Sequence, residues 1–228
     1  RRQRQMCIRD RYIPKEQINS FFQDINSFGI SYVLIKNMDD ELPAHLENGK
    51  DIDILVKEED KDLFAQKMLG LRYQSCIPPC GISNGWSFAY GLTEYQFWKK
   101  PVEEYDIYID ACFKLCCKSL TPKVWIPLDK KINNDIWEQR VWNEKQKWYE
   151  LDEKTEVIYL VVRSIFDKHV FSNVYKKEIE KRKNLLKECD VREKLQLVFF
   201  HFTDTLIEMV LNGRYEEIIP KYLSFTEY

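Results

Sequence analysis

A long apolar run and an excess of positive charge are both missing from this sequence of 228 residues. A membrane-spanning helix needs about 20 mostly apolar residues. The most apolar stretch, residues 195–211, is interrupted by His201, Asp204 and Glu208. We therefore expect a buried helix there and no membrane span. The formal net charge is −2, so charge gives no reason to expect a nucleic-acid partner.

Histidine is rare, with 3 in the chain, and the 7 cysteines are not spaced like metal ligands. The motifs Cys76-x3-Cys80 and Cys112-x3-Cys116-Cys117 are spaced more widely than a usual structural zinc site, and no histidine lies near them in sequence. An odd number of cysteines without a recognisable secretory signal favours reduced thiols in a cytoplasmic protein. We interpret these cysteines as buried or half-exposed thiols.

The pattern of apolar residues predicts an α+β fold. Strands are expected at 30–36, 51–56 and 105–111, with further ones near 72–77, 86–92 and 95–98. Helices are expected at 14–28, 58–70, 156–169, 174–187, 192–212 and 216–223. We predict a small mixed β-sheet with flanking helices over residues 1–125. A helical C-terminal subdomain is predicted over residues 126–228, where the only glycine is Gly213.

Two aspartates on one expected strand are the strongest chemical signal. Strand alternation puts Asp51 and Asp53 on one face, while Ile52 and Ile54 point to the other, into the core. Two neighbouring carboxylates disfavour each other's ionisation, and a hard cation such as Mg²⁺ offsets that cost. The plain alternative is a turn residue followed by an exposed strand residue. The pair follows a glycine turn and opens an apolar strand, which places it at a rim that substrate can approach.

A second acidic strand lies at 105–111, where Asp106, Tyr108 and Asp110 share one face. If this strand lies beside 51–56, one of its aspartates completes a cluster of three carboxylates. Such a cluster can hold one or two metal ions and leave a carboxylate to activate an attacking hydroxyl. We favour Asp110 as the third carboxylate and interpret Asp106 as a charge at the strand edge.

Three segments together resemble a known superfamily. They are Val33-Leu34-Ile35-Lys36-Asn37, Asp51-Ile52-Asp53-Ile54-Leu55-Val56 and Tyr108-Ile109-Asp110-Ala111-Cys112. Their order resembles the nucleotidyltransferase superfamily of DNA polymerase beta, over roughly residues 14–118. More narrowly, it is similar to bacterial nucleotidyltransferase-like proteins found with surface-polysaccharide biosynthesis. Those proteins typically carry L-L-K-G, then D-I-D-L-L-V, then an aspartate followed by histidine.

The resemblance implies that Asp51, Asp53 and Asp110 are catalytic and bind Mg²⁺ or Mn²⁺. It also puts Lys36 near the triphosphate, and we expect Lys36, Asn37 and Lys50 to bind substrate. The chain departs from the family in two places. Lys36-Asn37 stands where a Gly-Gly or Gly-Ser pair is usual, and without glycine the backbone approaches phosphate less easily. The histidine expected after the third aspartate is missing.

Three functions follow as hypotheses. The first is transfer of a nucleotidyl group from a Mg²⁺-bound nucleoside triphosphate to a small hydroxyl or phosphate acceptor, expected to be a sugar or polyol of surface-polysaccharide biosynthesis. The second is a phosphotransferase that moves a phospho-polyol or phosphocholine-type group from a CDP-linked donor. The third is a binding module with a degenerate active site.

The helical half offers weaker candidates. Arg163, Asp167 and His169 lie at helical spacing, and we interpret them as a surface ion pair followed by a helix-end histidine, with ligand contact as the alternative. His201 is interpreted as a core histidine.

Overall fold

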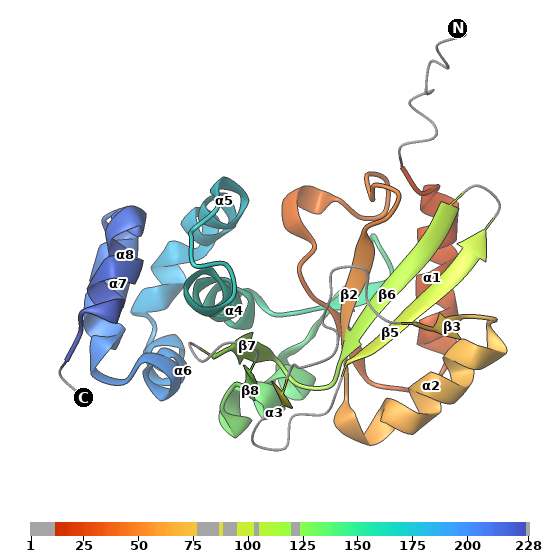
Figure 1. Ribbon diagram of the computed structural model, residues 1–228, viewed down its shortest axis with the longest axis horizontal. Helices are drawn as coiled ribbons and strands as arrows, with labels where there is room; N and C mark the ends of the chain where they lie inside the picture. The colour runs from red at the N-terminus through yellow and green to blue at the C-terminus, as the bar shows by residue number, and fades with distance from the viewer. Residues whose placement is uncertain (1–11, 77–86, 89–94, 103–104, 120–123, 227–228) are drawn as a thin grey trace, which may run out of the picture. The chain divides into compact units, whose positions relative to one another are not determined.

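The computed structural model describes residues 12–76, 87–88, 95–102, 105–119 and 124–226 (Figure 1). The chain divides into two compact units that are both discontinuous in sequence. The first comprises residues 1–84, 93–114 and 141–150, and the second comprises residues 85–92, 115–140 and 151–228. The prediction that 1–125 and 126–228 are the two domains stays a prediction.

The first unit is built on a seven-stranded mixed sheet with the strand order β3-β5-β6-β2-β1-β10-β9. Its strands are β1 (Tyr32–Leu34), β2 (Asp51–Val56), β3 (Gln74–Ser75), β5 (Gln96–Val102), β6 (Tyr105–Cys112), β9 (Val141–Asn143) and β10 (Trp148–Glu150). Strand β2 is antiparallel to β1 and parallel to β6. β2 and β6 therefore each have a neighbour on both sides, which fixes the position of the acidic residues that they carry.

Helices pack against one face of this sheet through apolar side chains. They are α1 (Lys15–Ser27) and α2 (Lys61–Gly70), which follows the 3-10 turn η3 (Glu58–Asp60). The core contains Phe22 of α1, Phe64 of α2 and the strand residues Ile52, Ile54 and Ile109. Because side chains alternate along a strand, burial of these isoleucines leaves the aspartates of β2 and β6 on the opposite face.

The second unit is mostly helical and carries a small sheet with the order β4-β8-β7. Its helices are α3 (Lys130–Gln139), α4 (Glu153–Phe166), α5 (Asn173–Arg182), η4 (Lys183–Lys187), α6 (Cys189–Phe199), η5 (Phe200–Phe202), α7 (Thr203–Leu211) and α8 (Tyr215–Leu223). Its strands are β4 (Ser87–Phe88), β7 (Cys116–Lys118) and β8 (Val124–Pro127). Helix α4 is buried at almost every position from Val157 to Ile165, as expected of a central helix. None of the described helices is long and apolar enough to cross a bilayer.

The predicted α+β fold class is confirmed: a mixed sheet with flanking helices is accompanied by a helical C-terminal part. The prediction of one helix over 192–212 is wrong, because the chain breaks between α6 and α7. Phe200 has φ 49° and ψ −128°, far from helical values. The break leaves His201 exposed, so its interpretation as a core histidine is also wrong. Only residues 87–88 of the strand expected near 86–92 lie among the described residues.

Candidate functional site

The first part of the site is the edge at which β2 begins. Gly49 has φ 92°, a left-handed conformation that glycine adopts readily, and the chain then enters β2 at Asp51. Ile52 and Ile54 are fully buried, whereas Asp51 and Asp53 are partly exposed. The predicted alternation is therefore observed, with the two carboxylates on the face that carries no α1 or α2 core contacts.

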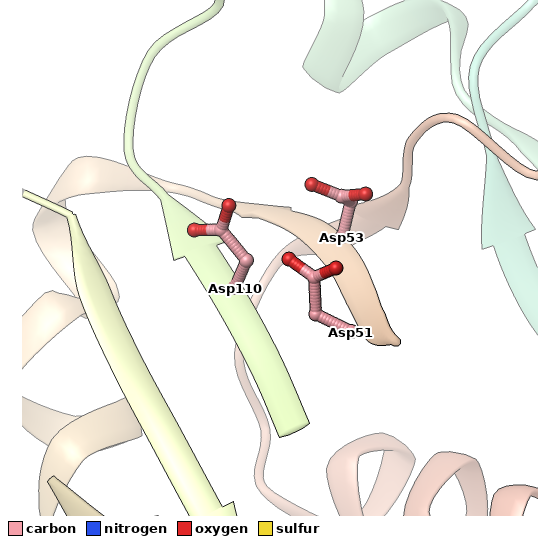
Figure 2. Close-up of side chains that lie close together, drawn as sticks. All are labelled: Asp51, Asp53 and Asp110. Atoms are coloured by element: carbon pink, nitrogen blue, oxygen red, sulfur yellow. The ribbon is translucent and has the colours of Figure 1, made fainter. Parts of the chain in front are cut away.

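The third carboxylate comes from β6, through the parallel pairing of the two strands. Asp53 is in register with Asp110, and Asp51 is in register with Tyr108. One carboxylate oxygen from each of Asp51, Asp53 and Asp110 lies within 4.8 Å of the other two. Figure 2 shows the three side chains converging from the two strands. We call these three residues the carboxylate cluster.

Asp106 lies on the same strand but is held by other residues. Its carboxylate forms an ion pair with Lys99 at 2.9 Å and accepts a hydrogen bond from the Tyr108 hydroxyl at 3.2 Å. It is in register with Pro101 of β5 rather than with a residue of β2. The geometry thus brings Asp110, and not Asp106, to Asp51 and Asp53.

The lysine at the end of the first strand contacts the cluster directly. Lys36 Nζ forms an ion pair with Asp53 Oδ1, and the two side chains are only 16% and 18% exposed. Lys36 has φ 64°, the left-handed region that a lysine seldom adopts. Lys36 therefore occupies a left-handed backbone position for which glycine is better suited.

The side chain of Asn37 supports the loop that follows β1. Its Oδ1 accepts a hydrogen bond from the backbone N–H of Leu42 at 3.0 Å, and Leu42 is buried. This contact folds residues 37–42 into a closed turn. Substrate binding by Asn37 stays a prediction.

Lys50, immediately before the cluster, is held by acidic residues of the same loop. Its Nζ lies 2.6 Å from Glu41 and 3.9 Å from Glu47, while its side chain remains half exposed. The hydrogen bond to Glu41 raises the pKa of Lys50 above its ordinary value. Substrate binding by Lys50 also stays a prediction, and it would require the exchange of Glu41 for a ligand.

The donor set of the cluster fits a divalent metal ion. Asp51, Asp53 and Asp110 offer only carboxylate oxygens, the ligands that Mg²⁺ and Mn²⁺ prefer. With Lys36 counted, the formal charge of the group is −2, so a divalent cation would complete its neutralisation.

Among the described residues no cluster of cysteine or histidine has comparable geometry. Cys112, Cys116 and Cys117 are buried, as the interpretation of these cysteines as buried or half-exposed thiols expects.

Tyr108 is a neighbour of the cluster for which the sequence suggested no role. It shares a face with the cluster through its register with Asp51, and its ring stacks on Phe97 with centroids 5.8 Å apart. The signal was present in the alternation of Asp106, Tyr108 and Asp110. A flat ring on the same face as the carboxylate cluster is a surface on which a base or sugar can lie.

Two of the helical-half candidates, Arg163 and Asp167, form an internal ion pair. Asp167 is buried, lies 3.5 Å from the Arg163 guanidinium and accepts a hydrogen bond from the backbone N–H of Lys118 at 2.8 Å. The interpretation of Arg163 and Asp167 as a surface ion pair is therefore wrong, because the pair is internal and joins α4 to β7. His169 is exposed, just after α4.

No protein-family model and no curated protein sequence matches the chain. Among solved structures, the chain is similar to an antigenic nucleotidyltransferase-like protein from Paracoccidioides brasiliensis, with 8% identity and a TM-score of 0.42 over 85% of this chain and 91% of that one. It is also similar to the antibiotic-resistance factor ANT(2'')-Ia, with 6% identity and a TM-score of 0.36 over 93% of this chain and 100% of that one. With TM-scores below 0.5, these likenesses are weak.

Proposed function

We propose that the chain is a metal-dependent nucleotidyltransferase. The observation that carries the proposal is the register of Asp53 with Asp110 on two central strands, which gathers three carboxylates on one face of the sheet. Asp51, Asp53 and Asp110 would hold Mg²⁺ or Mn²⁺. When bound, the metal would neutralise phosphate charge and orient the α-phosphate for in-line attack.

The chain's own residues then have distinct tasks. Lys36 supplies a positive charge next to Asp53, where it can bind a phosphate oxygen. Asp110 accepts the proton of the attacking hydroxyl at its carboxylate. The hydroxyl oxygen forms a bond to the α-phosphorus, the bond from that phosphorus to the bridging oxygen breaks, and pyrophosphate leaves with the electron pair.

The finer part of the proposal is the substrate. We propose a nucleoside triphosphate as donor and a sugar or polyol as acceptor, in the cytoplasm, and this rests on the motif resemblance described above. A CDP-linked donor is the competing candidate, because the same cluster could bind its diphosphate. Neither candidate requires a nucleic-acid partner.

Product analysis tests the proposal. The protein is incubated with each nucleoside triphosphate or with CDP-linked polyols and choline, together with Mg²⁺ or Mn²⁺ and a panel of sugar and polyol acceptors. Pyrophosphate release that depends on metal and acceptor supports nucleotidyl transfer, whereas CMP release supports the phosphotransferase. Asp51→Asn with Asp53→Asn is the control. Equal turnover in that double variant, or metal-dependent nucleotide binding without any turnover in the wild type, would overturn the proposed activity.

A further inference from the structure

Lys36 already provides the carboxylate cluster with a cation. Its ammonium pairs with Asp53, one of the three residues that would bind a metal, and both side chains are largely withdrawn from solvent. An ion pair at a partly buried site is screened less by water and salt than one at the surface. The lysine therefore lowers the repulsion among Asp51, Asp53 and Asp110 while no divalent ion is bound.

The backbone at Lys36 holds this arrangement at a cost. A non-glycine residue with φ 64° is strained. The turn is stabilised by the hydrogen bond from Met38 N to Lys36 O at 3.0 Å and by the contact of Asn37 with Leu42. The backbone is thus fixed, while the long stem of the side chain can move its ammonium without moving the loop.

We propose that Lys36 is a built-in counter-cation of the cluster, which releases Asp53 when a divalent ion is bound and then contacts a phosphate of the nucleotide. The inference rests on the proposed function and deepens it. Lys36 and a divalent ion compete for the Asp53 carboxylate, so each weakens the binding of the other there. A nucleotide phosphate that binds the released ammonium ends this competition.

Two consequences separate this role from a purely structural one. Without nucleotide, Lys36 weakens metal binding, so its removal should strengthen it. With nucleotide, Lys36 gains a partner, so metal and nucleotide should assist each other's binding in the wild type. This coupling is reciprocal by thermodynamic necessity, and it should become weaker when the ammonium is removed, leaving only the part that comes from direct contact between metal and phosphate.

The experiment measures Mn²⁺ binding by electron paramagnetic resonance, with and without a non-hydrolysable nucleoside triphosphate analogue. The variants are Lys36→Met and Lys36→Gly. The glycine variant suits the left-handed backbone, so it keeps the test valid if the methionine variant fails to fold. Lys57→Met is the matched control, because it removes the same charge at the far end of β2, where Lys57 pairs with the exposed Glu59 at 2.7 Å.

We expect both Lys36 variants to bind Mn²⁺ alone about tenfold more tightly than the wild type, within the usual range of coupling between ligands. The analogue should tighten Mn²⁺ binding by a larger factor in the wild type and in Lys57→Met than in the Lys36 variants. If the wild type binds Mn²⁺ and the Lys36 variants bind it no better, the counter-cation role is overturned while the proposed function stands. If no protein in the set binds Mn²⁺, the metal site itself is wrong, and both proposals fall.

Discussion

Asp53 and Asp110 lie directly opposite each other on the neighbouring parallel strands β2 and β6. Their carboxylates point to the same side of the sheet, together with that of Asp51 (Figure 2). Two acidic side chains at such a position repel each other. Lys36 offsets part of that repulsion, and a divalent cation would offset the rest.

Asp53→Asn and Asp110→Asn should each reduce Mn²⁺ affinity and nucleotidyl transfer by at least about 100-fold. Even the loss of a residue that only supports a metal ligand costs 10- to 100-fold. Folding should be unaffected by Asp110→Asn, since it removes a repelling charge, whereas Asp53→Asn also removes the ion-pair partner of Lys36 and should lower stability. Titration with Mn²⁺ and thermal unfolding measure the two effects. Asp106→Asn is the control, because Asp106 pairs with Lys99. An equal loss in this control would show that charge on the face, rather than the cluster, governs binding.

Asn133 should be essential for stability of the helical unit. Its Oδ1 accepts from Leu115 N at 2.7 Å, and its Nδ2 donates to Leu128 O at 2.9 Å, all in a buried setting. Asn133→Ala leaves these backbone groups without their partners, which should lower the free energy of unfolding by about 2 kcal/mol. Urea unfolding measures the change. Asn134→Ala, at the exposed neighbouring position, should have little effect. Similar losses in both variants would point to helix propensity as the cause.

Lys194 and Asp135 should behave as a coupled pair. The Lys194 side chain is 2% exposed and lies 3.0 Å from Asp135, whose side chain is 23% exposed. Asp135→Asn leaves the buried ammonium beside the neutral Gln139 side chain, whose Oε1 lies 3.3 Å from it, and the loss of one partner of such a pair costs about 3 kcal/mol. Lys194→Met should cost less, because Asp135 can face water and keeps Lys131 at 3.4 Å. In a double-mutant cycle measured by urea unfolding, the double variant should lose less free energy of unfolding than the sum of the two single losses. Strict additivity would show that the pair is not coupled.

The same aspartate predicts a pH dependence. Partial burial disfavours the charged form of Asp135, but hydrogen bonds from Lys194 and Lys131 outweigh this and lower its pKa. Because the pKa of Asp135 is lower in the folded state, the ionised carboxylate stabilises the fold at every pH above the ordinary aspartate pKa of about 3.9. That contribution is lost as the pH falls through the folded-state value. The stability difference between wild type and Asp135→Asn should therefore be largest near neutral pH and shrink in acid. A difference that stays constant across an acid series of urea titrations would contradict this.

Phe200→Gly should stabilise the protein. Phe200 has φ 49° and ψ −128°, and its side chain is 64% exposed, so little burial is lost and backbone strain of about 1–3 kcal/mol is relieved. We expect an increase of about 1 kcal/mol in the free energy of unfolding. The gain is smaller than the full strain energy because glycine also makes the unfolded chain more flexible. Phe200→Ala is the matched control, since it removes the ring but keeps the strained backbone. An equal gain in the alanine variant would assign the effect to removal of the exposed ring.

Local sequence patterns were sufficient to predict the elements that carry the cluster. Strand β2 spans Asp51–Val56, as expected, because acidic and apolar residues alternate over residues 51–54 and an apolar run follows. β6 was predicted by the same alternation, and α1 by its helical spacing and by Gly29 after it. The pairing of β2 with β6 was a conditional expectation, since one sequence does not specify which strands become neighbours.

Other features depend on contacts that local patterns do not encode. The hairpin β9–β10 was not predicted, although it extends the sheet through the parallel pairing of β10 with β1. Its turn contains no glycine, and Asn143 Oδ1 instead accepts from Lys145 N and Gln146 N. The ion pair of Lys36 with Asp53 was likewise not predicted, because it depends on a backbone conformation unusual for lysine.

The carboxylate cluster is divided between two distant parts of the chain, with Asp51 and Asp53 on β2 and Asp110 on β6. A nascent chain that has emerged only as far as β5 carries two of the three aspartates. The third arrives with β6, and it is positioned only when that strand pairs in register with β2. Formation of such long-range pairs is slow compared with local helix formation. A divalent ion that binds the complete cluster would therefore report, during synthesis or refolding, the moment at which the central strands come together.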